Sequence, residues 1–214
     1  MPVAPGTPLD PAATRAKMLA AATDLFYACG VHAVGVEEIA RLAGVSKLSL
    51  YRHFGSKDRL VAEVLSLRSD RVHAWLARSV EDVEEDSPRA RILAMFDAIC
   101  GWYGQSGFKG CAIVNGATDT RGDRGDIQTI ARRHLERYER LFCAELTDMG
   151  ADDPIGLARQ LLILVEGATV IAAIEGSPDA GSYARCAAET LLDALHPEQG
   201  ISTTSPSGGT QATK

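Results

Sequence analysis

Apolar residues recur at intervals of three and four along almost the whole chain, and this spacing is the strongest constraint on its fold. The first such set lies on one face of a helix and consists of Met18, Ala22, Leu25, Phe26 and Cys29. Gly30 would end this helix, because glycine readily adopts the left-handed conformation found after a helix. No segment alternates apolar with polar residues as a half-buried strand would. The spacing therefore predicts an all-α fold.

Further helical faces follow along the chain. They are predicted from Leu60 toward Val80, from Pro88 to Cys100, from Ile127 to Leu146, from Pro154 to Ile174, and from Pro178 to Leu195. The three prolines suit the first turn of a helix, where no backbone N–H is needed for the helical ladder. Together with the helices expected before residue 60, these segments predict about nine helices.

Both ends of the chain resemble disordered tails. Residues 1–13 contain four prolines and few large apolar groups, and residues 197–214 are rich in Ser, Thr and Gly. Neither segment offers enough apolar surface to offset the entropy lost on ordering. We therefore expect tails at 1–13 and 197–214 around two folded segments, 14–60 and 61–196.

Charge is distributed unevenly between the two folded segments. Residues 14–60 hold seven Lys or Arg against four Asp or Glu, although the whole chain has a net charge of −6. A small basic segment joined to an acidic body indicates a local site for a polyanion.

The sequence argues against membrane insertion, secretion and catalysis. The longest apolar stretch, Leu161–Ile174, is interrupted by Glu166 and has 14 residues, whereas a bilayer span needs about 20. No signal peptide is recognisable, so a cytoplasmic protein without a membrane partner is expected. The five cysteines have no Cys-x-x-Cys spacing, which favours small buried thiols, with a redox-sensing thiol as the alternative. No catalytic set, metal site or cofactor motif is identifiable, and the double Arg-Gly-Asp at 121–126 is predicted to be a loop.

Residues 36–54 have the pattern of a helix-turn-helix. Ile39 and Ala43 would form the apolar side of a short helix that Gly44 ends. Ser46 would cap a second helix, which buries Leu50 and leaves its polar and basic residues facing solvent. A helix with that polarity suits the major groove of DNA.

The run from Arg15 to Leu60 resembles the N-terminal domain of the TetR family of transcriptional repressors. The matching residues are Leu25-Phe26, Gly30, Ile39-Ala40, Ala43-Gly44-Val45-Ser46, Leu50-Tyr51, His53-Phe54, Ser56-Lys57 and Leu60. In the body, Phe108-Lys109-Gly110-Cys111 with Asn115 resembles a short helix of the family's ligand domain. The resemblance implies an N-terminal three-helix DNA-binding domain and a C-terminal helical domain for ligand binding and dimerisation.

Residues expected to contact DNA are Gly35, Ser46, Lys47, Leu48, Ser49, Tyr51, Arg52, His53 and Lys57. Lys47 is placed to meet guanine or phosphate, and Leu48 to touch a thymine methyl group or to pack within the domain. The resemblance implies backbone contacts for Tyr51 and His53, and a phosphate contact for Lys57 at a helix N-terminus. Relatives commonly have Ser or Thr at Gly35, so weaker phosphate binding is expected there.

The body supplies candidates for a ligand pocket and for a dimer interface. The pocket candidates are the aromatic and polar residues Trp75, Phe96, Cys100, Trp102, Tyr103, Phe108, Cys111, Asn115, His134, Tyr138, Phe142 and Glu166. Taken alone, each is more often a core residue than a ligand contact. His134 could instead be a surface group beside two arginines, and Glu166 could line a cavity, accept from a ligand, or lie at an interface or the surface. The interface candidates are Leu161, Leu164, Val165, Ala168, Ala172, Ala188, Leu191, Leu192 and Leu195, from the last two helices, which the resemblance implies form a four-helix bundle with a second copy.

The function predicted from the sequence is that of a homodimeric repressor. It would bind a palindromic operator in double-stranded DNA and be released by a small, largely apolar effector. The alternatives are an activator or ligand-independent regulator of the same fold, and an all-α carrier or enzyme.

Overall fold

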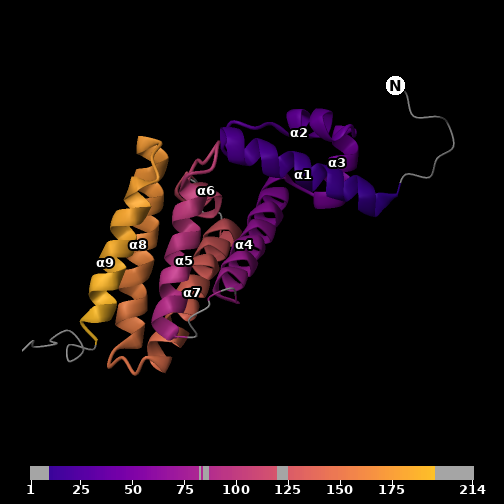
Figure 1. The fold of residues 1–214 in the computed structure, drawn as a ribbon. Helices are drawn as coiled ribbons and strands as arrows, with labels where there is room; N and C mark the ends of the chain where they lie inside the picture. The colour runs from indigo at the N-terminus through magenta and orange to yellow at the C-terminus, as the bar shows by residue number, and fades with distance from the viewer. Residues whose placement is uncertain (1–9, 82, 84–86, 120–124, 196–214) are drawn as a thin grey trace, which may run out of the picture.

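The computed structural model describes residues 10–81, 83, 87–119 and 125–195, and within these ranges it has nine helices and no strand, which confirms the all-α prediction. The helices, labelled in Figure 1, are α1 (Pro11–Cys29), α2 (Val36–Ala43), α3 (Lys47–Phe54), α4 (Lys57–Glu81), α5 (Pro88–Tyr103), α6 (Ala112–Thr118), α7 (Gly125–Asp148), α8 (Pro154–Glu175) and α9 (Asp179–Asp193).

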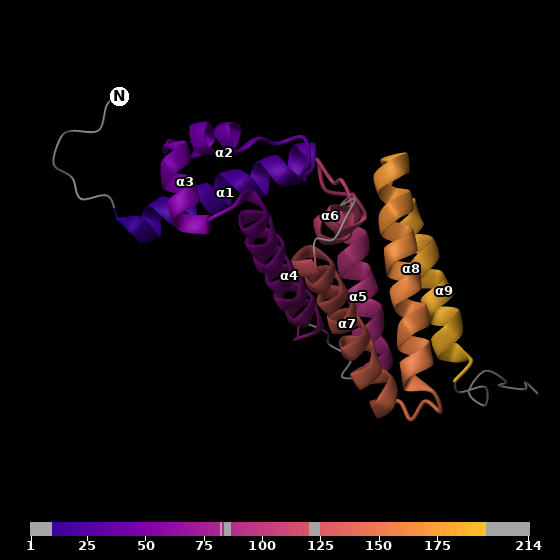
Figure 2. The same cartoon turned by 180° about the vertical axis from the view of Figure 1, so that it is seen from behind.

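The helices form a small tip and a larger bundle. The tip, α1–α3, lies across one end of α4. The long helices α4, α5, α7, α8 and α9 run alongside one another in the bundle, or body, with the short α6 at the end nearer the tip (Figures 1 and 2). Helices α8 and α9 lie on the flank of the body opposite α4. This arrangement presents α2 and α3 at one extremity of the molecule.

Polar caps fix the starts of several helices. Asp10 accepts a hydrogen bond from the amide N–H of Ala12 at 2.9 Å, and Pro11 follows in the first turn. Helix α1 therefore starts within the segment expected to be a tail, so the expected limit at residue 13 is too late. Ser87 and Asp153 cap α5 and α8 in the same way, each ahead of the proline that the sequence placed in the first turn.

Two hydrophobic clusters fill the interior. The body cluster contains Phe96, Phe142 and Leu161. The tip cluster contains Met18 and Leu50 from the tip, and it continues into the body through residues of three other helices, namely Val61, Val64 and Leu65 of α4, Ile113 and Ala117 of α6, and Ile127 and Ala131 of α7. The core of the tip is therefore completed by helices that belong to the body.

Helix α8 spans almost the same residues as the sequence predicted, ending at Glu175 instead of Ile174. Within the described ranges it is the one helix whose length and composition would suit a membrane span, with 22 residues and a mean hydropathy of 1.8 over its most apolar window. It packs against α7 and α9 along the body, and 39% of that window is buried within this single chain. A core helix of a soluble protein can have the same length and composition, so α8 is weak support for a membrane location.

The cysteines differ from the expectation of small buried thiols. Only Cys111 is buried, Cys100 and Cys143 are half-buried, and Cys29 and Cys186 are exposed; all five are free. Cys29 is the last residue of α1, where Phe26 and Val31 occupy the inward side instead. The predicted loop at 121–126 falls mostly outside the described residues, and α7 begins at Gly125.

Candidate nucleic-acid interface

The corner between α2 and α3 depends on Gly44. This residue has φ 68° and ψ 33°, a left-handed conformation that costs residues with a Cβ atom about 1–2 kcal/mol. The amide of Val45 donates to the carbonyl of Ala40 at 2.9 Å, which closes the end of α2. The chain then turns directly into α3, as the helix-turn-helix pattern predicts.

Helix α3 is held by a cap at its start and by the buried side chains of Leu50 and Phe54. The Oγ of Ser46 accepts a hydrogen bond from the amide of Ser49 at 3.1 Å, and the side chain of Leu50 is completely buried. The opposite face contains Lys47, Leu48, Tyr51 and Arg52, all exposed, with Leu48 60% exposed. This outward face is short, mixed in polarity and open, as a DNA-reading helix requires.

Lys47 has an acidic partner that the sequence analysis did not anticipate. Its ammonium group forms an exposed ion pair with Glu37 in the first turn of α2. The hydrogen bond between them lowers the pKa of Glu37 and raises the pKa of Lys47. A DNA contact by Lys47 must therefore replace this carboxylate with a phosphate or a base edge.

The remaining DNA candidates surround α3. Gly35 precedes α2 with extended backbone and gives no side-chain cap. The weaker phosphate contact expected at this position stays a prediction. His53 is half-buried. Lys57, at the start of α4, donates its Nζ to the carbonyl of Val31 at 2.7 Å. Lys57 therefore also holds the segment before α2 against α4.

The twelve pocket candidates do not surround one cavity. Phe96, Tyr103, Tyr138 and Phe142 are buried side chains of the body cluster. Phe108 packs edge-on against Trp102, with ring centroids 4.7 Å apart, and Cys100 is half-buried on α5. Trp75 and Trp102 line a cleft beside α1, whereas Cys111, Asn115 and Glu166 line a separate cavity of about 230 Å³ between α6 and α8.

A buried polar cluster joins α4, α7 and the residue before α6. His134 is 1% exposed, and its Nδ1 lies 2.9 Å from the Oγ of Ser69 and 3.1 Å from the Nε2 of His73. Its Nε2 lies 3.6 Å from the Sγ of Cys111. The surface alternative for His134 is thus wrong. Ser69 and His73 were not among the candidates from the sequence, although both lie on the inward side of α4 at four-residue spacing.

Glu166 is the acidic residue with the largest pKa shift among the described residues of the body. Its Oε2 is buried and has no hydrogen-bond partner among the described residues, and burial raises the pKa of its carboxyl to about 7. The nearby hydroxyl of Tyr103 instead donates to the carbonyl of Val165 at 3.1 Å. An uncharged Glu166 could donate a hydrogen bond into the cavity that it lines.

The predicted interface residues mostly face the protein's own core. Six of the nine are buried within this single chain, namely Leu161, Val165, Ala168, Ala172, Ala188 and Leu192, and Leu164, Leu191 and Leu195 are half-buried. The six buried positions are thus a wrong choice for a partner surface, because α7 and α5 cover that side of α8 and α9. The open apolar stripe is the next one round α8, formed by Ile163, Gly167, Val170, Ile171 and Ile174, with Tyr183 of α9 beside it.

The tip and body are also tied by the segment before α6. Lys109 donates its backbone amide to the hydroxyl of Tyr27 at 3.0 Å and its Nζ to the carbonyl of Ala28 at 2.7 Å. These bonds join the body to the C-terminal end of α1, where a cation also interacts favourably with the helix dipole. The segment before α6 is therefore a second connection between tip and body, besides α4.

Comparisons with known proteins agree with this geometry. Residues 18–64 match the family of bacterial regulatory proteins described as the TetR family. A solved structure described as a TetR transcriptional regulator (SAV143), from Streptomyces avermitilis, is 34% identical, covers 85% of this chain and 97% of that chain, and has a TM-score of 0.75.

Two curated relatives come from Mycolicibacterium smegmatis. The transcriptional repressor KstR2 is 44% identical over 98 residues, which are 45% of this chain and 46% of the relative. The transcriptional activator FasR is 38% identical over 87 residues, or 40% of each. The chain thus spans less than half the length of these curated relatives, whereas it aligns with almost the whole of the Streptomyces protein. From the helix-turn-helix geometry and this full-length similarity, we conclude that the chain belongs to the TetR family of transcriptional regulators.

Proposed function

We propose that the chain is a repressor that binds a palindromic operator as a homodimer and is released by a small, largely apolar effector. The observation that carries this proposal is the polarity of α3, which buries Leu50 and exposes Lys47 and Arg52 at one end of the molecule. DNA binding would use the segment 14–60, and residues 61–196 would bind the effector and the second subunit. A DNA partner implies a cytoplasmic location, and no catalytic role is proposed.

A dimer is proposed because one recognition helix reads too few base pairs. Two copies placed about 34–36 Å apart would enter successive major grooves. The exposed stripe on α8 supports this assembly, since Ile163 is 63% and Ile174 is 79% exposed in the single chain. Apolar side chains gathered on one helix face indicate a partner surface.

Titration with DNA at several salt concentrations tests the proposal. The duplex is selected from a random pool by repeated binding to the protein at low salt. Lys47→Ala and Arg52→Ala should each weaken DNA binding. If the residue contacts phosphate, the slope of log binding constant against log salt concentration should also become shallower by about one. Lys47→Ala should also relax base preference if Lys47 reads a base.

Arg132→Ala is the matched control, because Arg132 is an exposed arginine on α7 of the body. It should leave both the affinity and the salt slope unchanged. If the wild-type chain selects no duplex, or if all three variants bind alike, the proposed DNA interface is wrong.

Activation of transcription is a second candidate function. The similarity to FasR, whose name describes an activator, favours it. A reporter gene placed behind the selected duplex separates the two functions. Expression should fall when the wild-type protein is added if it represses, and rise if it activates.

A further inference from the structure

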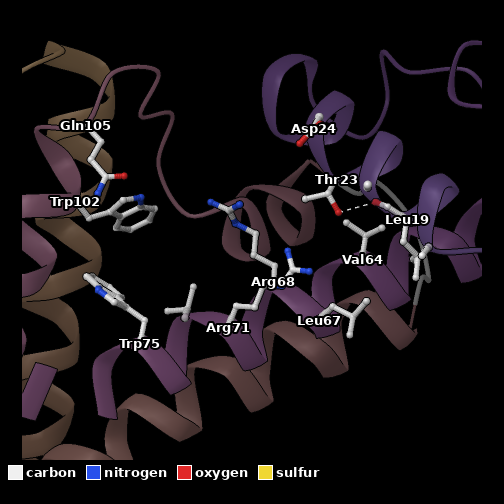
Figure 3. Close-up of a pocket in the computed structure, with 13 residues that line it drawn as sticks. Leu19, Thr23, Asp24, Val64, Leu67, Arg68, Arg71, Trp75, Trp102 and Gln105 are labelled. Atoms are coloured by element: carbon white, nitrogen blue, oxygen red, sulfur yellow. Dashed lines mark hydrogen bonds between the residues drawn. The ribbon is translucent and has the colours of Figure 1, made fainter. Parts of the chain in front are cut away.

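A cleft of about 530 Å³ lies where the tip meets the body (Figure 3). Its walls come from three helices, with Leu19 and Thr23 on α1, Leu67 and Arg71 on α4, and Trp102 on α5. Small-molecule sites in proteins commonly occupy about 300–1,000 Å³. The cleft is thus large enough for a small ligand, and it is separate from the cavity lined by Glu166.

Aromatic and aliphatic side chains make the cleft suitable for an apolar ring. Trp75 of α4 and Trp102 of α5 lie at its body end, and these are the two tryptophans of the whole chain. Leu19, Val64 and Leu67 add aliphatic surface nearer the tip. Indole rings stack on flat aromatic ligands, and such stacking adds to the binding free energy that comes from burying apolar surface.

Two guanidinium groups lie between these walls. Arg68 and Arg71 rise from α4 into the space between the indoles and α1 (Figure 3). Arg68 stacks on the ring of Tyr27 at 4.2 Å, and neither arginine has a carboxylate within 4.0 Å in the described part of the chain. Asp24 is the one acidic residue of the lining, so the lining has a net charge of about +1.

We propose that this cleft binds an aromatic monoanion, namely a flat ring system with one carboxylate or sulfonate group. The rings would lie against Trp75 and Trp102, and the anionic group would accept hydrogen bonds from Arg68 and Arg71. A polyanion fits less well, because Asp24 faces the same space. A cation is disfavoured by the two arginines.

Binding of a ligand in the cleft would change the affinity of the protein for DNA, and this consequence rests on the proposed function. The ligand touches α1 of the tip together with α4 and α5 of the body. It therefore favours one orientation of the tip relative to the body, and with it one spacing of the two recognition helices. By linkage, DNA must change the affinity for the ligand by the same factor.

Isothermal titration calorimetry with 8-anilino-1-naphthalenesulfonate tests the site, because this probe combines aromatic rings with one sulfonate. We expect one molecule bound per chain. Arg68→Gln and Arg71→Gln should each weaken binding at least tenfold. The uncharged analogue N-phenyl-1-naphthylamine should bind with an affinity that Arg71→Gln leaves unchanged, since it lacks the sulfonate.

Two control variants distinguish the cleft from other sites. Arg78→Gln removes an exposed arginine of α4 outside the cleft, and Tyr183→Ser removes an exposed ring from the α8–α9 stripe. Both should keep the wild-type affinity for the sulfonate within twofold. If Arg68→Gln and Arg71→Gln also stay within twofold, or if Tyr183→Ser abolishes binding, the cleft assignment is wrong.

The coupling is measured with the selected duplex. Saturating probe should change the DNA affinity of the wild-type protein at least threefold, and Arg71→Gln should remove that change. Equal DNA affinity with and without probe would overturn the coupling. If the wild-type protein binds no duplex, the proposed function fails, whereas the calorimetry still decides whether the cleft is a ligand site.

Discussion

At the scale of single residues, burial sets the protonation of three groups in the body. Desolvation lowers the pKa of His73 to about 4 and of His134 to about 3, and it raises the pKa of Glu166 to about 7. The Nδ1 of His73 has no partner among the described residues, so a proton added there would lack a hydrogen-bond acceptor. These three side chains make the stability of the body sensitive to pH.

The histidine pair predicts a loss of stability in mild acid. Both folded-state pKa values lie below the ordinary value of 6.5. The contribution of the two histidines to the free energy of unfolding is therefore complete above pH 6.5 and is lost as the pH falls toward 4. For His73 alone the loss at pH 5 is about 2 kcal/mol. His73→Phe should reduce this loss, and urea denaturation at pH 7 and pH 5 measures it. A variant that keeps the full wild-type difference between the two pH values would contradict the assignment.

Glu166 predicts the opposite dependence on pH. Its folded-state pKa is raised, so the ionised carboxylate lowers the free energy of unfolding. This destabilisation is absent below about pH 4.5 and complete once the pH exceeds 7, where it reaches about 3 kcal/mol. Glu166→Gln should therefore be more stable than wild type at pH 8 and equal to it near pH 4.5. Denaturation curves at both pH values measure the difference. Glu175→Gln, at an exposed position of the same helix, should show no gain at pH 8.

At the scale of helices, local signals in the sequence were sufficient to predict several helix boundaries, but not the contacts between helices. Ser46, Gly44 and the prolines at the starts of α5 and α8 act within one or two turns of their own position, so the chain predicts these boundaries directly. The burial of His134 depends on partners 61 and 65 residues away, which no local pattern reveals. The ion pair between Lys47 and Glu37 likewise depends on how α2 and α3 cross.

Substitution of Gly44 tests the geometry of the corner. Gly44→Ala should destabilise the protein by about 1 kcal/mol or more, because its φ of 68° strains a residue with a Cβ atom even where nothing lies within 4 Å. Gly101→Ala is the control, since Gly101 lies in the helical backbone of α5 and also has open space around it. That variant should be neutral or slightly stabilising. Thermal denaturation distinguishes them, and equal effects would argue against backbone strain.

At the scale of the whole molecule, the sequence of α8 has apolar residues on more than one side of the helix, and their spacing does not indicate which side faces the core. The inner stripe packs on α7, and the outer stripe remains open in a single chain. Both stripes obey the same spacing, so only the packing of the complete bundle separates them. The cleft beside α1 escaped prediction for a related reason, since its walls come from helices distant in sequence.

The outer stripe of α8 makes the oligomeric state a direct test. The wild-type chain should be a dimer, and Ile171→Glu should convert it to a monomer, because a charge in an apolar interface is costly unless paired. Leu42→Glu, at an exposed apolar position of α2, should remain dimeric. Sedimentation velocity measures both, and a dimeric Ile171→Glu variant would exclude this stripe as the interface.

The shared interior of α4, α6 and α7 constrains how proteins of this shape can be rebuilt. Val61, Val64 and Leu65 of α4 and Ile113 of α6 complete the cluster that surrounds Met18 and Leu50. The tip therefore cannot be exchanged between proteins as an independent unit. A chimaera joined at residue 60 would separate Met18 and Leu50 from the body side chains that pack around them, which would leave poorly matched apolar surfaces at the junction. A functional chimaera would also have to include the adjoining turns of α4, α6 and α7.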